Sequence, residues 1–279
     1  MKVFLAPTDF SEASFFAIRY ALYQFCEEAV ELHLLHVYTP LPISGRFLVQ
    51  NDSSDYLAPL VEEIAKEQLQ VFETRLASNF DLRLKICSHS SFSLLNHAID
   101  DLVAAFDVDL IIAATEKDGG LATFIQGSST NAMIRGLKSA PLLIVPSQTN
   151  LTPLTKIAVA IEPNTDLDSH SKEIIDTWVK SMNLELLFVE VIEDQVPIPV
   201  EAPSYASSLE DRKRIKISKA GRAVSDVLTE FCWQQQISLI VLQHKRRGVL
   251  YRLLHEPTIN NLVFNHRVPM LILPDSDIS

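Results

Sequence analysis

DLIIAATEKDGGLATFIQGSSTNAMIRGLKSAPLLIVP, residues 109–146, is the stretch of the sequence that decides the fold. Its residues 110–114 form an apolar run that is too short for a comfortable helix and is typical of a buried parallel strand. A glycine-containing loop follows, and a short helix is predicted to open at Gly127 and to run to about Leu137. Residues 142–145, between two prolines, are a second buried strand. This layout is one with which α/β proteins present backbone N–H groups to a phosphate.

The residues before this stretch predict alternating strands and helices. The expected strands are 3–7, 32–37 and 82–88, and the expected helices are about 11–26, 57–77 and 95–106. Ser11 is the expected N-cap of the first helix, because the apolar spacing of three and four begins directly after it. This order, with strands that are apolar on both faces, predicts a parallel sheet with right-handed crossovers.

The same order returns in the second half of the 279-residue chain. The predicted repeats of the first, second, fourth and fifth strands are 156–161, 185–191, 239–241 and 269–274. A repeat in this order indicates two homologous domains, 1–147 and 154–275, each a five-stranded parallel sheet with helices on both faces, related by a pseudo-two-fold axis. The second copy is shorter, and residues 195–218 are predicted to form an extended loop with a short turn of helix.

The last strand of each copy carries no charge and no glycine, so an exposed edge there would invite aggregation. We expect Leu142–Val145 and Met270–Leu273 to pair with each other and so cover both edges. The alternative is that a loop covers each edge separately.

Composition narrows the class of protein. A net charge of −11 disfavours nucleic acid as a partner, because phosphate backbones are held by clustered Lys and Arg. The sequence shows no apolar run long enough for a membrane span and no signal-peptide pattern, so we expect a cytoplasmic protein. Cys26, Cys87 and Cys232 lack metal-ligand spacing, which favours buried thiols in a reducing compartment and predicts no metal site.

Three segments resemble the universal stress protein family. They are the opening VFLAPTDFS, the strand LHLLHV and the closing GSST with APLLIVP. The chain as a whole resembles the tandem, two-domain members of that family. The resemblance implies a Rossmann-like fold of the adenine nucleotide alpha hydrolase-like type, a role in the stress response, dimer-like pairing through the last strand and, in many members, bound ATP.

The resemblance also implies a site. In the ATP-binding type an Asp after the first strand lies near the nucleoside, and a motif G-x2-G-x9-G-[ST] follows the fourth strand. Carried over to this sequence, residues 7–9 would face the base and ribose, Val37 would border the base, and residues 127–129 would hold phosphate oxygens, with Mg²⁺ only as a companion of the nucleotide. The candidate cofactor-binding residues are Pro7, Thr8, Asp9, Val37, Ala113, Ala114, Lys117, Gly127, Ser128 and Ser129.

The sequence departs from this pattern in both halves. Ala114 and Lys117 stand at the first two motif glycines, where a side chain lies in the path of the phosphates. Lys117 either blocks that path or meets a phosphate directly with its ammonium group. In the second half Glu162 stands near the position of Asp9, and residues 255–257 (HEP) replace the Gly-Ser pair, so we expect no nucleotide there.

Three functions follow from these residues. The first is a module that binds ATP or a related adenine nucleotide in the first domain and presents a nucleotide-dependent surface to an unidentified protein partner. The second is a nucleotide-free scaffold of the same fold. The third, a slow nucleotide hydrolase, is disfavoured because no histidine is identified as a base for Ser128 or Ser129, so we expect no catalytic residues and no enzyme.

Overall fold

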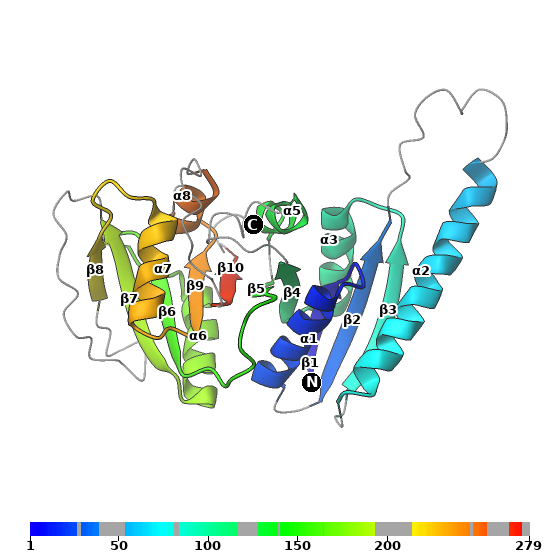
Figure 1. Ribbon diagram of the computed structural model, residues 1–279, viewed down its shortest axis with the longest axis horizontal. Coiled ribbons are helices and arrows are strands. Elements are labelled where there is room, and N and C mark those ends of the chain that lie inside the picture. Colours follow the sequence, from blue (N-terminus) through cyan, green and yellow to red (C-terminus); the bar gives the residue numbers. More distant parts are fainter. Residues whose placement is uncertain are drawn as a thin grey trace. The chain divides into compact units, whose positions relative to one another are not determined.

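The computed structural model (Figure 1) describes residues 1–26, 29–38, 54–80, 84–115, 128–138, 140–163, 165–192, 214–245, 248–255 and 268–274. Its contacts divide the chain into two compact units, Met1–Ala113 and Ala114–Ser279. Among the described residues, no helix combines the length and apolar character that crossing a bilayer requires.

The first unit is built on four parallel strands in the order β3-β2-β1-β4. They are β1 (Lys2–Pro7), β2 (Val30–Val37), β3 (Leu84–Ser91) and β4 (Leu110–Thr115). Phe4, Leu5 and Ala6 in the middle of β1 are fully buried. The chain passes outward from β1 to β3 and then returns to the other side of β1. The strand order therefore reverses at β1, and open α/β sheets place ligands beyond the carboxyl ends of their strands at such a point.

Helices cover both faces of this sheet. They are α1 (Glu12–Phe25), α2 (Ser54–Ala77), which runs along β3 in Figure 1, and α3 (Leu95–Phe106). On one face Phe15 of α1 packs edge to face against Phe72 of α2, with ring centroids 5.8 Å apart. On the other face Phe106 of α3 packs against His33 and His89. The predicted α/β class with a parallel sheet is confirmed, and the predicted helices are found to within a few residues.

The second unit repeats this order. Its strands are β5 (Leu142–Pro146), β6 (Lys156–Ile161), β7 (Glu185–Ile192), β8 (Arg214–Ser218), β9 (Leu239–Gln243) and β10 (Met270–Leu273). Its helices are α5 (Ser128–Arg135), α6 (Ser169–Met182), α7 (Val224–Gln234) and α8 (Val249–His255). The order β8-β7-β6-β9 is that of β3-β2-β1-β4, and all these pairings are parallel. The strand repeat read from the sequence is therefore present in the structure.

The predicted pairing of the two last strands is confirmed. β5 and β10 run antiparallel, with Leu143 opposite Leu271, and β10 pairs on its other side with β9. All residues of both strands are buried. This pairing explains why contacts group β5 with the second unit, whereas the boundary predicted from the sequence follows β5. The domain limits 1–147 and 154–275 and the pseudo-two-fold relation stay predictions.

One prediction about the second copy is wrong. Residues 214–218 are not part of a loop or a helical turn but form β8, which pairs in parallel with β7. Ile215 and Ile217 are buried, whereas Arg214 and Lys216 between and before them are not, which is the two-residue alternation of a strand at a sheet edge. The charged residues 210–214 (EDRKR) obscure this alternation in the sequence. The rest of 195–218 lies outside the described residues.

Candidate functional site

The turn after β1 is fixed by backbone and hydroxyl groups. The N–H of Thr8 donates to the carbonyl of Leu35 at 2.8 Å, which prolongs the pairing with β2. The hydroxyl of Thr8 is buried, accepts a hydrogen bond from the N–H of Phe10 at 3.0 Å and shares a second with the hydroxyl of Ser14 at 3.0 Å. Phe10 has a φ of 64°, a left-handed conformation that costs free energy for a non-glycine residue. The buried hydroxyl therefore helps to hold a strained turn.

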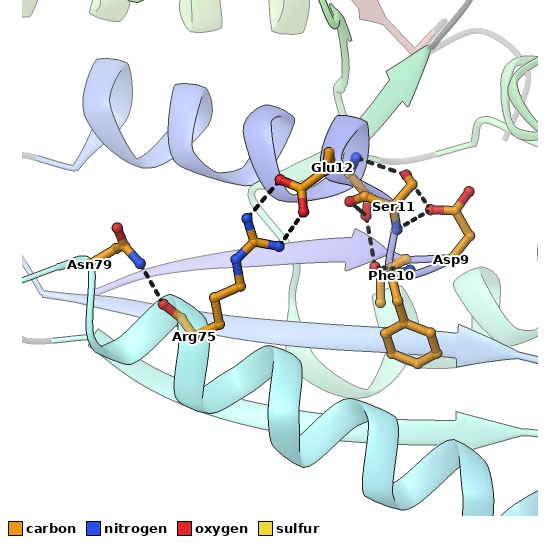
Figure 2. A network of polar contacts seen from close by, with 8 residues as sticks. Asp9, Phe10, Ser11, Glu12, Arg75 and Asn79 are labelled. Carbon is orange, nitrogen blue, oxygen red and sulfur yellow. Dashed lines mark hydrogen bonds and ion pairs between the residues drawn. The ribbon is translucent and has the colours of Figure 1, made fainter.

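Asp9 projects from this turn and is exposed (Figure 2). Its Oδ1 accepts hydrogen bonds from the N–H of Ser11 at 3.1 Å and from the hydroxyl of Ser11 at 2.6 Å. Burial of the carboxyl group alone would raise its pKa, but its hydrogen bonds, first of all those from Ser11, together outweigh that effect and lower the pKa of Asp9 below its usual 3.8. Asp9 is thus an ionised, oriented acceptor at neutral pH.

Helix α1 begins directly at this turn. Ser11 is its N-cap, as predicted, and its Oγ accepts a hydrogen bond from the N–H of Ser14 at 3.2 Å. Glu12 in the first turn forms a bidentate pair with Arg75 of α2, with both N–O distances 2.6 Å (Figure 2). The Arg75 guanidinium also lies over the ring of Phe15, 3.8 Å from its centroid. These contacts fix α2 to the start of α1.

The end of β2 packs against the same turn. Nδ1 of His36 donates to the carbonyl of Thr8 at 2.9 Å, and the His36 ring packs on Phe10 with centroids 4.4 Å apart. Val37, the next residue, is partly buried at the carboxyl end of the strand. Val37 therefore lies at the same edge of the sheet as residues 7–9, and the contacts of these residues with a nucleotide stay predictions. Phe10 and Ser14 were missed by sequence reasoning; the Asp9–Ser11 spacing was the only local signal for this turn.

The remaining candidate residues lie on β4 or after it. Ala113 is buried near the carboxyl end of β4, which pairs in parallel with β1 and so ends at the same edge of the sheet as the turn. Ala114 is the next residue of β4. Lys117 and Gly127 lie outside the described residues, and the side chain of Ser128 is not described. Ser129 is exposed in the first turn of α5. Their predicted role as a phosphate-binding segment stays a prediction.

The corresponding turn in the second unit, after β6, is built differently. The carbonyl of Glu162, at the position of Asp9, accepts hydrogen bonds from the N–H and hydroxyl of Thr165 at 3.1 and 2.7 Å. Arg214 of β8 donates to the carbonyl of Thr165 at 2.7 Å and to Oε1 of Glu190 at 2.9 Å. The strand register places Glu190 where β2 has His36. An arginine–glutamate pair therefore replaces the histidine.

Two lysines complete the charged network around the turn after β6. Lys245, just beyond β9, donates to the carbonyl of Asp166 at 2.9 Å. Lys172 of α6 lies 3.1 Å from the carboxylate of the same Asp166. Three cations, those of Lys172, Arg214 and Lys245, thus converge on one turn and are paired there with carboxylates or carbonyls.

A buried amide also occupies the end of β9. Gln243 is buried and donates to the hydroxyl of Ser171 at 3.1 Å. Ser171 in turn is held by Asp168, the N-cap of α6, at 2.8 Å through its N–H and 3.0 Å through its hydroxyl. The strand register equates Gln243 with Ala114, so a long polar side chain stands where the first copy has a methyl group.

Comparison with known proteins agrees with this geometry. A model of the universal stress protein family matches residues 1–146, which is more than half of the 279-residue chain. The chain belongs to the universal stress protein family. No curated protein sequence matches it. The family match covers β1 to β5, and therefore includes the turn that carries Asp9.

The similarity to solved structures covers almost the whole length of the chain. A universal stress protein from Archaeoglobus fulgidus DSM 4304 matches with a TM-score of 0.57 and 15% identity, over 99% of this chain and 97% of that chain. A functionally unknown protein from Pseudomonas aeruginosa PAO1 matches with a TM-score of 0.54 and 15% identity, over 100% of this chain and 94% of that chain. At this identity the likeness shows the universal stress protein fold alone.

Proposed function

We propose that this protein is a tandem universal stress protein of the cytoplasm that binds ATP or a related adenine nucleotide through its first copy only. The observation that carries the proposal is Asp9, an exposed carboxylate with a lowered pKa, at the carboxyl end of β1, where the strand order reverses. The free thiols of Cys26, Cys87 and Cys232 support a reducing compartment.

Asp9 suits the ribose of such a nucleotide. Its Oδ1 accepts two hydrogen bonds from Ser11, which fix the direction of the carboxylate. An ionised carboxylate can accept hydrogen bonds from ribose hydroxyls, as an Asp or Glu at another position does in dinucleotide-binding α/β folds. Val37, at the end of the neighbouring strand, supplies an apolar border for the base.

The phosphates are assigned to Gly127, Ser128 and Ser129 on the sequence alone, with Lys117 as a candidate contact and any Mg²⁺ arriving with the nucleotide. A change of occupancy would then alter the loop between Thr115 and Ser129 and, through it, a surface for a protein partner. The second copy is assigned no ligand, because cations already bound to carboxylates and carbonyls close its corresponding turn.

Equilibrium binding of ATP at physiological magnesium tests the proposal on the full chain. We expect the wild type to bind one equivalent, and we expect Asp9→Ala and Gly127→Glu each to weaken binding at least tenfold. Glu162→Ala is the matched control in the second copy and should bind as the wild type does. Equal binding by wild type and both first-copy variants, or no binding at all, would show that the nucleotide assignment is wrong.

A nucleotide-free scaffold is the second candidate, and Ala114 is the observation that favours it. This residue, with Lys117, puts side chains where the family motif has glycines. The same titration decides between the two, since a scaffold gives no heat of binding with ATP. We propose no hydrolytic activity: phosphate release should stay at background in the wild type and in Asp9→Ala.

A further inference from the structure

Three side chains of different chemistry converge on the face of the first sheet that α3 covers. Glu31 and His33 are two residues apart on β2 and therefore point to the same face. Cys87 on β3 lies opposite His33 in the parallel register. One carboxylate oxygen, one imidazole nitrogen and the thiol sulfur of these residues all lie within 4.8 Å of one another.

The distances in this cluster suit a metal ion. Nε2 of His33 lies 3.2 Å from Oε1 of Glu31, and Sγ of Cys87 lies 3.6 Å from the same oxygen. Around a tetrahedral zinc ion with ligand bonds of about 2.0–2.3 Å, neighbouring ligand atoms lie about 3.3–3.6 Å apart. The distances of Oε1 of Glu31 from Nε2 of His33 and from Sγ of Cys87 are therefore those expected if all three atoms bound one zinc ion.

The imidazole of His33 supplies a second, independent observation that points to a bound metal ion. The residue is 1% exposed, and its buried Nε2 makes no hydrogen bond with the described residues although it points at Glu31. A buried polar atom without a hydrogen bond is costly, and such atoms are rare in native proteins. A cation between this nitrogen, the carboxylate and the sulfur would satisfy all three.

The other nitrogen of His33 is positioned as in known metal sites. Nδ1 lies 2.9 Å from Nε2 of His89, the two rings are stacked with an interplanar angle of 5°, and Phe106 packs against both. When Nδ1 of a histidine donates its hydrogen to a neighbour, Nε2 is left as a lone pair for a metal. In the tautomer in which Nδ1 of His33 is the donor, His89 accepts that hydrogen and Nε2 of His33 is left for a metal.

We propose that Glu31, His33 and Cys87 form a zinc site in the first unit, separate from the turn that carries Asp9. Sulfur, imidazole and carboxylate together are the ligands of Zn²⁺, whereas Ca²⁺ and Mg²⁺ prefer oxygen alone. When the zinc–sulfur bond forms, the thiol of Cys87 releases its proton to solvent. Three protein ligands leave the fourth position of the ion for a water molecule.

Lys85 is the competitor for this ion. Its ammonium group lies 2.9 Å from the same Oε1 of Glu31, yet the side chain is 62% exposed. The ammonium can therefore move into solvent when a metal arrives. In the metal-free protein it partly neutralises Glu31, so its removal should tighten metal binding.

Zinc titration of the metal-stripped full chain tests the site. We expect the wild type to take up one Zn²⁺ against a chromophoric chelator, and we expect Cys87→Ser and Glu31→Gln each to bind at least tenfold more weakly. Cys26→Ser is the matched control, since Cys26 is also a free, partly buried thiol of the first unit. Equal affinity in all four proteins would overturn the proposal.

Two further measurements test the zinc site even if substitution of a buried ligand disturbs the fold. Co²⁺ in place of Zn²⁺ should give a thiolate-to-cobalt charge-transfer band in the wild type and in Cys26→Ser but not in Cys87→Ser; a band that persists in Cys87→Ser contradicts the proposal. Lys85→Gln changes only an exposed side chain and should bind Zn²⁺ severalfold more tightly. No gain in affinity in this variant would also count against the site.

Discussion

The turn after β1 and the turn after β6 occupy the same place in two copies of one strand order, yet their hydrogen-bond donors differ. After β1 the donors are neutral, the N–H of Phe10 and the N–H and hydroxyl of Ser11. After β6 the cations of Arg214 and Lys245 donate in addition to the neutral groups of Thr165. The first arrangement leaves a carboxylate exposed; the second closes its turn with charges that are already paired.

If the first copy binds a nucleotide as proposed, this difference indicates how the corresponding position of the second copy became structural. Glu190 replaces His36, and Gln243 replaces Ala114, so the second copy has a carboxylate and a long amide at two points where the first has an imidazole and a methyl group. Glu190 is almost fully buried, and the ion pair of its Oε1 with Arg214 offsets part of its desolvation, whereas its Oε2 makes no hydrogen bond with the described residues. The cost of breaking such a pair is the most direct measure of how far the second copy depends on it.

We expect the largest loss in the free energy of unfolding for Arg214→Met. Glu190 would remain buried without its partner, and loss of one partner of a buried pair costs about 3–5 kcal/mol, which we reduce to about 2–3 kcal/mol because Arg214 is partly exposed. Urea unfolding measures the change. Arg222→Met, which breaks the exposed pair with Glu230, is the control and should cost at most about 1 kcal/mol. Equal costs would mean that the buried network does not stabilise the second copy.

A smaller effect is expected for Thr8→Val in the first copy. Valine keeps the shape of the buried side chain but removes the acceptor for the N–H of Phe10 and the partner of Ser14. Loss of a buried hydrogen bond of this kind costs about 1–2 kcal/mol. The urea midpoint should fall accordingly, with Thr8→Ser as the control that retains the hydroxyl. An unchanged midpoint in Thr8→Val would mean that the buried hydroxyl does not stabilise this turn.

The fold could be predicted from the sequence because its signals are local. The apolar runs of β1, β4 and β5 and the N-cap Ser11 each depend on residues close in the chain. β8 was missed because its alternation spans only five residues and begins within a run of charges. The pairing of β5 with β10 was predicted from a general physical cost, the exposure of apolar sheet edges, and not from any contact visible in the sequence.

The sites were harder to predict because their contacts join distant residues. Arg214 reaches Thr165 and Glu190 across 49 and 24 positions, and no periodicity links them. Glu31 and Cys87 are 56 positions apart and meet only through the parallel register of β2 and β3. Asp9 was identified through the family resemblance, which places an Asp after the first strand near the nucleoside, but the bonds that lower its pKa depend on the conformation of the turn.

The N-caps of α1 and α6 should contribute different amounts to the free energy of unfolding. We expect this difference to be smaller than the loss of stability in Arg214→Met or Thr8→Val. Ser11 caps α1 with one bond to the helix, whereas Asp168 caps α6 with bonds to both the N–H and the hydroxyl of Ser171 and adds a negative charge at the helix N-terminus. We expect Ser11→Ala to cost about 1 kcal/mol and Asp168→Ala somewhat more, about 1–2 kcal/mol. Thermal or urea unfolding of the two variants measures the order, and the reverse order would contradict this account.

The smallest expected change in stability is the one linked to the titration of Asp9 in acid. Its folded pKa is lower than its unfolded pKa, so the folded state binds fewer protons and the group stabilises the protein above the unfolded pKa. That contribution is lost as the pH falls through the folded pKa. Ser11→Ala removes the hydroxyl donor and should raise the pKa of Asp9 in an NMR titration of its carboxyl carbon. The stability gap between wild type and Ser11→Ala should therefore narrow in acid, and a constant gap with an unchanged pKa would mean that Ser11 stabilises only the helix.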